Sequence, residues 1–229
     1  MTDVVLFEGD GIGPEITKSV VEILEAAGAQ IKWHPYMIGA NAYEKLGELI
    51  PAESKEAIAK YKVALKGPVT TPLGKGFKSV NVQLRLAFDL YTNLRPASSY
   101  KGLSRFQNVD IVTVRENTED LYIGEEHEID GGFEAIKRIT EKGSERIIRY
   151  AFEHAKNNGR KKVTAIHKSN ILKNSDGLFI KVFDKVAAEY PTIEADKKIV
   201  DNMCMQLVMY PEKYDVLVAP NLSGDIGTD

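Results

Sequence analysis

Residues 6–16, LFEGDGIGPEI, place three glycines between an apolar run and an expected helix. The dinucleotide fingerprint G-x-G-x-x-G needs its third glycine so that the helix can pack closely against the strand. Gly9 and Gly11 fit the pattern, but Pro14 stands at the third position. Proline suits the first turn of a helix, and residues 28–38 lack the acidic side chain expected to bind the ribose. The stretch therefore predicts a tight strand-to-helix turn rather than a Rossmann dinucleotide site.

The composition is that of a globular chain with a real apolar core. Of 229 residues, 43% are hydrophobic, and 30 basic against 33 acidic residues leave a net charge of −3. No basic block is present, so the charge gives no support for nucleic-acid binding. The single cysteine, Cys204, rules out an internal disulfide and is expected to be a buried thiol. No apolar run reaches the ~18 residues of a membrane span, and no targeting segment follows Met1, so we expect a cytoplasmic location and no membrane partner.

Short β-branched runs alternate with segments of helical period, which predicts an α/β fold with a largely parallel sheet. Strands are expected at 3–7, 31–37 and 62–66, and helices near 15–27 and 52–60. From about residue 98 three strand-like segments follow closely, VDIVTVREN, LYIGEEHEI and FEAIKRIT. They predict an antiparallel patch or a projecting ribbon over about 120–140. We expect two domains, 1–97 and 98–229.

Three arginines stand where elements are expected to end. In residues 78–96, KSVNVQLRLAFDLYTNLRP, Ser79 suits a helix cap and Asn81 and Arg85 are four residues apart on one helix face. Arg95 follows in the same stretch, and Arg115 follows a strand too apolar to lie on the surface. A single arginine is more often a solvated or ion-paired residue. Three arginines at the ends of helices or strands predict bidentate binding of a ligand that carries several carboxylates.

A tyrosine and a lysine are the candidate proton-transfer groups. Tyr122, in ENTEDLYIGEEH, is also compatible with a core aromatic whose hydroxyl is bonded. Lys168, in TAIHKSNILK, follows a buried-looking strand, where desolvation would lower its pKa towards that of a base, although an exposed strand end is equally compatible. The four histidines show no metal-ligand spacing, and His167 is expected to be structural.

Acidic residues near the end of the chain are candidate metal ligands. Asp225 and Asp229, in NLSGDIGTD, are four residues apart, so a helix would place both carboxylates on one side, as a hard divalent cation requires. Asp201, in IVDNMC, follows an expected apolar strand and would supply a third oxygen ligand. Together with the arginines, the lysine and the tyrosine, a metal here would suit a tricarboxylate.

A series of motifs in order along the whole chain resembles the β-decarboxylating dehydrogenases, the isocitrate, isopropylmalate and homoisocitrate dehydrogenase family. The series is GDGIGPE, KGPVTTP, SVNVQLR, NLRP, VTVRENTED, HKSNILK, SDGLF and NLSGD. SVNVQLR is similar to the isocitrate type, in which the serine and asparagine bind the distal carboxylate of the substrate. Most of the chain resembles the NAD-linked isocitrate branch. Two departures are Gly227 and Ser223, where the family commonly has larger residues.

The resemblance implies two α/β domains around a shared cleft, with a cofactor site that is not Rossmann. It implies that the substrate carboxylates are held by Ser79, Asn81, Arg85, Arg95 and Arg115. Tyr122 would be the acid and Lys168, from the neighbouring subunit, the base, assisted by Asp201. Mg²⁺ or Mn²⁺ would bind to Asp225 and Asp229 of one subunit and Asp201 of the other. Ile12, Thr70 and Thr71 would lie beside the cofactor, NAD or NADP.

The implied activity is oxidative decarboxylation of isocitrate to 2-oxoglutarate, a reaction of the tricarboxylic acid cycle, by a homodimer with shared active sites. Homoisocitrate or 3-isopropylmalate oxidation, or a non-catalytic regulatory subunit, are the alternatives. A regulatory subunit usually loses the tyrosine, the lysine or an aspartate, and this chain keeps all of them. By resemblance the chain is truncated, with the main dinucleotide loop beyond Asp229, so we expect this stretch alone to be inactive.

Overall fold

The computed structural model describes residues 1–70 and 79–228. The chain forms two compact units, Met1–Leu84 and Arg85–Asp229. The boundary expected near residue 98 falls at the end of β4 (Thr92–Ser98), which pairs along its length with β5 (Asp110–Glu116) of the second unit. Helix α4 (Val80–Ala87) contains the division between the units.

The first unit is built on a parallel sheet. Strand β1 (Thr2–Phe7) lies between β2 (Ile31–Tyr36) and β3 (Ala64–Lys66), and residues 4–7 of β1 are buried as a continuous apolar run. Fully buried runs are typical of central parallel strands. The connecting helices are α1 (Gly13–Ala26), α2 (Ala40–Leu46) and α3 (Ala52–Tyr61).

The turn between β1 and α1 has the form that the sequence predicts. Pro14 lies in the first turn of α1, and Gly9 has φ +84°. A Cβ atom at Gly9 would lie 2.0 Å from the carbonyl oxygen of Pro68, so glycine is required for the close approach of the two loops. The carboxylate of Asp10 accepts the backbone N–H groups of Ala40, Asn41 and Thr70. The buried carboxylate of Asp10 therefore connects the turn to two other segments of the first unit.

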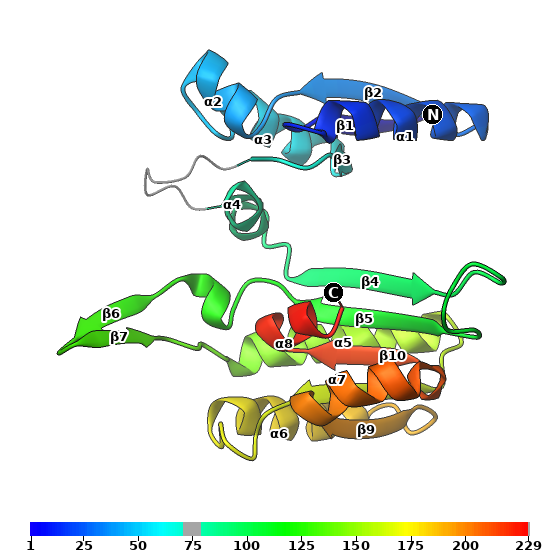
Figure 1. The fold of residues 1–229 in the computed structure, drawn as a ribbon, viewed down its shortest axis with the longest axis vertical. Helices are drawn as coiled ribbons and strands as arrows, with labels where there is room; N and C mark the ends of the chain where they lie inside the picture. The colour runs from blue at the N-terminus through cyan, green and yellow to red at the C-terminus, as the bar shows by residue number, and fades with distance from the viewer. Residues whose placement is uncertain (71–78, 229) are drawn as a thin grey trace. The chain divides into compact units, whose positions relative to one another are not determined.

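The second unit contains a mixed sheet with strand order β4-β5-β10-β8-β9 (Figure 1). Its remaining strands are β8 (Lys162–His167), β9 (Glu194–Ile199) and β10 (Val216–Ala219). Strands β5, β10, β8 and β9 are parallel, and only the β4–β5 pair within this sheet is antiparallel. The α/β class with a largely parallel sheet is therefore confirmed.

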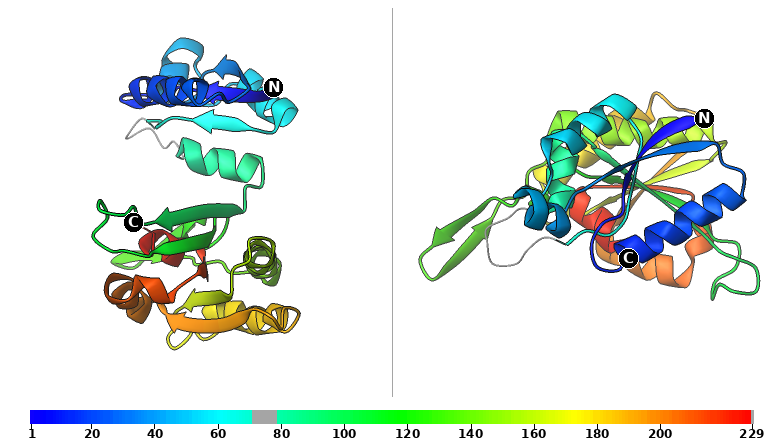
Figure 2. Two further views of the ribbon diagram at one scale, coloured as in Figure 1. Left: turned by 90° about the vertical axis from the view of Figure 1, so that its right-hand side faces the viewer. Right: turned by 90° about the horizontal axis from the view of Figure 1, so that it is seen from above.

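Helices cover both faces of this sheet. Helices α5 (Glu141–Asn157) and α6 (Ser175–Ala187) share a core with Val216 and Val218, whereas α7 (Val200–Met209) packs near Leu217 and Ala219 on the opposite face. Figure 2 shows α5 and α7 on opposite sides of the sheet. The alternation along β10 follows from the two-residue period of a strand. The short helix α8 (Asn221–Ile226) follows β10 directly.

A two-stranded ribbon, β6 (Glu126–Ile129) and β7 (Gly132–Ala135), extends from the second unit (Figures 1 and 2). The expected strand LYIGEEHEI is only partly a strand, because Leu121–Ile123 form the 3₁₀ turn η1 and Gly124 follows in the left-handed conformation. A second 3₁₀ turn, η2, spans Pro211–Lys213. In the part of the chain that the structure describes, every helix is too short or too polar to span a bilayer.

Candidate active site

The carboxyl ends of β5, β8 and β10 meet at one edge of the second unit's sheet, because these strands are parallel. Arg115 is near the end of β5, Lys168 follows β8, and α8 with Asp225 follows β10. Ligand sites in α/β sheets are commonly at this edge. The sequence-predicted residues of the second unit thus gather where the topology favours a site.

Arg115 is the buried centre of the site. Its side chain is almost fully buried, with 1% of the residue exposed. Its Nε donates to the backbone oxygen and the Oδ1 of Asn221, both at 3.0 Å, and its Nη2 donates to the same Oδ1 at 2.8 Å. Its Nη1 pairs with Asp225. These contacts hold the guanidinium rigidly against the first turns of α8.

Tyr122 reaches the same carboxylate from the η1 turn. Its hydroxyl donates to Asp225 Oδ2 at 2.5 Å, and the guanidinium of Arg115 lies over its ring, 5.0 Å from the ring centre. Burial raises the pKa of Tyr122, the hydrogen bond to Asp225 raises it further, and the charge of Arg115 opposes this. The phenol therefore keeps its proton at neutral pH, as a general acid must.

Two further arginines interact electrostatically with this group. Arg95 Nη2 lies 3.6 Å from Asp225 Oδ1, and its Nη1 donates to the hydroxyl of Thr228. The pKa of Arg85 is lowered by burial and by the charge of Arg115, and Asp225 partly offsets these effects. Arginine stays charged despite such a shift. Three guanidinium groups near one carboxylate leave an excess of positive charge, which suits a ligand with several carboxylates.

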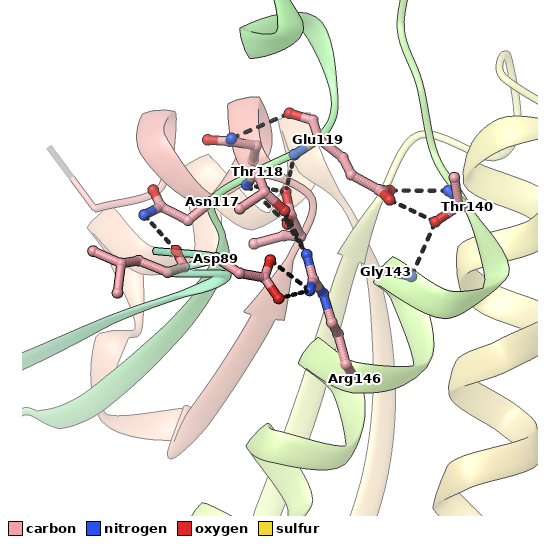
Figure 3. Close-up of polar contacts among 10 residues, drawn as sticks. Asp89, Asn117, Thr118, Glu119, Thr140, Gly143 and Arg146 are labelled. Carbon is pink, nitrogen blue, oxygen red and sulfur yellow. Dashed lines mark hydrogen bonds and ion pairs between the residues drawn. The ribbon is translucent and has the colours of Figure 1, made fainter. Parts of the chain in front are cut away.

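The loop that joins Arg115 to Tyr122 is fixed by its own acidic residues, which the sequence analysis did not single out. The buried carboxylate of Glu116 accepts the backbone N–H groups of Thr118 and Glu119 and the Thr118 hydroxyl. Glu119 accepts the backbone N–H and the hydroxyl of Thr140, which caps α5 through Gly143 N (Figure 3). The N-terminus of a helix favours a carboxylate. The loop is therefore anchored on α5.

Arg146 of α5 provides a second anchor for the same loop. It donates to both oxygens of Asp89, at 2.8 and 2.9 Å, and to the Thr118 hydroxyl at 2.6 Å (Figure 3). Asn117 donates to the backbone oxygen of Leu90 at 3.1 Å. The sequence does not reveal these contacts, because the residues that form each hydrogen bond are 27 to 57 positions apart in the chain.

The side chain of Lys168 pairs with Asp201. Its Nζ donates to Asp201 Oδ1 at 2.8 Å, and its backbone N–H donates to the fully buried Asp176 at 2.6 Å. The hydrogen bond from Lys168 lowers the pKa of Asp201, whose side chain is 68% exposed. Asp201 does not follow an apolar strand as expected: β9 is a charged edge strand, and Asp201 lies in the first turn of α7. His167 is half-buried, and burial lowers its pKa while the charge of Asp176 opposes this.

Ser79 and Asn81 belong to the first unit, at the start of α4. Ser79 immediately precedes the helix, and its carbonyl accepts the N–H of Gln83. Within the described structure, the Oδ1 of Asn81 is buried without a hydrogen-bond partner. A buried acceptor without a partner is costly to a fold.

Of the predicted cofactor residues, Ile12 precedes α1 and is 65% exposed, and Thr70 is held through its N–H by Asp10 at 2.7 Å. Thr71 lies outside the described residues, as does Asp229. Among the residues that the structure does describe, no group of three His, Cys, Asp or Glu side chains is placed to hold a metal ion. Asp225 and Asp201 therefore do not form a complete metal site within one described chain.

The sequence model of the isocitrate/isopropylmalate dehydrogenase family matches residues 3–229. The chain belongs to this family. A catalytic subunit of mitochondrial NAD isocitrate dehydrogenase from Arabidopsis thaliana is 47% identical over 98% of this chain. A regulatory subunit of the corresponding enzyme from Dictyostelium discoideum is 48% identical over 99% of the chain. The chain spans 60% and 63% of the lengths of these two relatives.

A solved structure supports the same fold. The crystal structure of isocitrate dehydrogenase from Methylococcus capsulatus is 49% identical, with a TM-score of 0.94 over 100% of this chain and 69% of that one. The relatives from Arabidopsis and Dictyostelium are mitochondrial. The expected cytoplasmic location is therefore wrong: these relatives point to mitochondria.

Proposed function

We propose that the whole protein catalyses the oxidative decarboxylation of isocitrate to 2-oxoglutarate with NAD and a divalent cation. The observation that carries this proposal is the convergence of Arg85, Arg95 and Arg115 on Asp225 and Tyr122. Isocitrate has three carboxylates and a hydroxyl, so it needs several cations and a proton donor in one place. The family membership and the names of the relatives support the same reaction.

The arginines have the task of binding and orienting the substrate. Arg115, fixed by Asn221, would present a rigid fork to one carboxylate, and Arg85 and Arg95 would bind the others. Ser79 and Asn81 would bind the distal carboxylate, the serine through its hydroxyl and the asparagine through its Nδ2 donor. A site with buried polar groups of this kind rejects substrates that lack the matching carboxylate.

The proton transfers fall to Lys168 and Tyr122. Lys168 Nζ, as the neutral amine and assisted by Asp201, would accept the proton of the substrate hydroxyl while the carbon that bears this hydroxyl gives up its hydride. The resulting β-keto acid loses carbon dioxide, and the electron pair of the broken bond remains on the neighbouring carbon. Tyr122, whose pKa is raised, would donate its proton to that carbon.

The oxygen chemistry of Asp225 and Asp201 fits a hard divalent cation such as Mg²⁺ or Mn²⁺. By the family resemblance, Asp225 and Asp229 would hold it together with Asp201 of the partner subunit. When bound, NAD accepts the hydride and the cation stabilises the negative charge on the substrate oxygen. Ile12, Thr70 and Thr71 would contact the cofactor; NADP is the alternative dinucleotide.

We further propose a homodimer with shared active sites, in which Lys168 and Asp201 serve the partner's site. The side chains of Lys168 and Asp201 pair with each other, whereas Asp225 pairs with Arg115, which agrees with this arrangement. Mixing full-length Lys168→Met with Arg115→Leu subunits tests it. Hybrid dimers should regain up to one intact site, whereas inactive hybrids of proven composition would contradict sharing.

Two alternatives are supported by relatives of similar identity. A 3-isopropylmalate dehydrogenase from Solanum tuberosum is 46% identical, and the Dictyostelium relative is a regulatory subunit. A substrate panel on the full-length protein separates them, with isocitrate, homoisocitrate and 3-isopropylmalate each tested with NAD and NADP. We expect the highest kcat/KM with isocitrate and NAD. A preference for 3-isopropylmalate, or binding of isocitrate without turnover, would overturn the assignment.

A further inference from the structure

A largely buried lysine lies between two buried carboxylates beside the candidate site. Lys137 is in the segment between β7 and α5, and its side chain is 17% exposed. Its Nζ lies 2.6 Å from Asp176 Oδ1 and 3.8 Å from Asp120 Oδ1, and both aspartates are fully buried. The Asp176 contact is an ion pair without hydrogen-bond geometry.

Each of these carboxylates also holds backbone of the candidate site. Asp176 Oδ2 accepts the N–H of Lys168 at 2.6 Å. Asp120 Oδ2 accepts the N–H of Leu222 at 2.9 Å, at the start of the helix that carries Asp225. Asp120 Oδ1 accepts the N–H of Leu121 at 2.9 Å, in the turn that carries Tyr122. One ammonium group thus connects the backbone at three places near proposed catalytic side chains.

The backbone of Asp120 is strained, which indicates that its surroundings impose its position. Its φ of 69° and ψ of −153° lie in a region that side-chain-bearing residues rarely adopt. Its N–H donates to the backbone oxygen of Arg138 at 2.8 Å, directly beside Lys137. Such conformations persist only where neighbouring contacts determine them, and they cluster at functional sites.

Stability alone does not require this arrangement. Replacing a buried ion pair by apolar residues of similar size is often neutral or stabilising, so such a pair is weak support for a stabilising role. What the charges supply here is fixed geometry, because each carboxylate has a second contact with site backbone. We propose that Lys137 is a positioning residue for Lys168 through Asp176, and for the Tyr122 turn and α8 through Asp120. The inference rests on the proposed function of those groups.

The test is the full-length Lys137→Met variant, with Lys162→Met as the matched control. Lys162 also has a largely buried side chain between two carboxylates, 2.9 Å from Glu194 and 3.4 Å from Asp196, but at the opposite end of β8. Lys137→Met should lower kcat by about tenfold to a hundredfold, as small misplacements of catalytic groups do. KM for isocitrate should stay within about twofold, the expected signature of lost alignment rather than lost binding.

Hydrogen exchange of peptides containing the Lys168 and Leu222 amides provides a readout independent of catalysis. Both amides should exchange faster in Lys137→Met than in Lys162→Met. If Lys137→Met does not fold, the double variant Lys137→Met/Asp176→Asn replaces it. The asparagine removes the buried negative charge and retains an acceptor for the Lys168 amide, and the same lowered kcat is expected.

The proposal is overturned if a folded variant at Lys137 keeps the kcat of the Lys162→Met control. It is equally overturned if kcat falls only in proportion to the folded fraction, or if the two amides keep their wild-type exchange. Should the wild-type protein not oxidise isocitrate, the proposed function fails by itself. The amide exchange then decides the positioning role alone.

Discussion

Gly224 of α8 packs directly against Arg115, and adding one methyl group there should disturb the substrate site. A Cβ atom at Gly224 would lie 2.7 Å from Cγ and 2.9 Å from Cβ of Arg115. Both distances are far below van der Waals contact, and the Arg115 guanidinium is held by Asn221 and Asp225 of the same helix. Gly224→Ala therefore forces the guanidinium or α8 to move.

The magnitude follows from two opposing effects on stability. Overpacking typically costs about 1–3 kcal/mol, whereas alanine is favoured over glycine in a helix by ~1 kcal/mol. The net loss of unfolding free energy is then about 0–2 kcal/mol, or a fall in Tm of no more than about 8 °C at ~2–4 °C per kcal/mol. Activity should suffer more, because a shift of about 1 Å in a substrate-binding group can cost ~100-fold.

Gly227→Ala is the control on the same segment. A Cβ atom there would meet only Ser223 O at 3.3 Å and Ile166 Cδ1 at 3.8 Å, so little has to move. Thermal melts and steady-state kinetics with isocitrate on full-length protein should show kcat/KM reduced about 100-fold for Gly224→Ala and nearly unchanged for Gly227→Ala. Equal kcat/KM for the two variants would refute the placement of Arg115 in the substrate site.

Three further changes have distinct expected outcomes. Tyr122→Phe should keep the fold but lower kcat by about 100- to 10,000-fold, the usual contribution of a general acid; a near-normal kcat would exclude Tyr122 as the donor. Ser79→Asp should sharply lower kcat/KM for isocitrate with an unchanged melting curve, because its charge would repel the distal carboxylate, and retained turnover would contradict the isocitrate assignment. The third change tests pH dependence: the hydrogen bond from Arg160 lowers the pKa of Asp110 below its ordinary 3.8. Its stabilisation is present above the unfolded-state pKa and is lost as pH falls through the folded value. Asp110→Asn should therefore lower Tm more at pH 7 than at pH 3, and equal shifts at both would show that the pair adds no stability.

The sequence alone predicted those helices, strands and turns that have a clear local sequence pattern. Strand β1, helix α1 and the Gly9 turn follow from an apolar run, a proline in the first helical turn and glycines where φ is positive. The arginines could also be singled out, because Arg115 stands in an apolar strand where a solvated charge is unfavourable.

The contacts that fix the site could not be predicted in this way, because they join distant positions. Lys137 and Asp176 are 39 residues apart in the numbering, and nothing in their immediate neighbours marks either as buried. Glu116 resembles the many surface acids of the chain, yet it is 4% exposed and closes the loop before Tyr122. Leu121–Ile123 were expected to be extended because their side chains favour strands, but tertiary contacts of Asp120 determine the turn.

The most direct test of the central claim is product analysis with the full-length protein, isocitrate, NAD and Mg²⁺. We expect 2-oxoglutarate and NADH to form in equal amounts, and Arg115→Leu to abolish both while the protein stays folded. Wild-type protein that binds isocitrate but forms neither product would contradict it and favour a regulatory subunit.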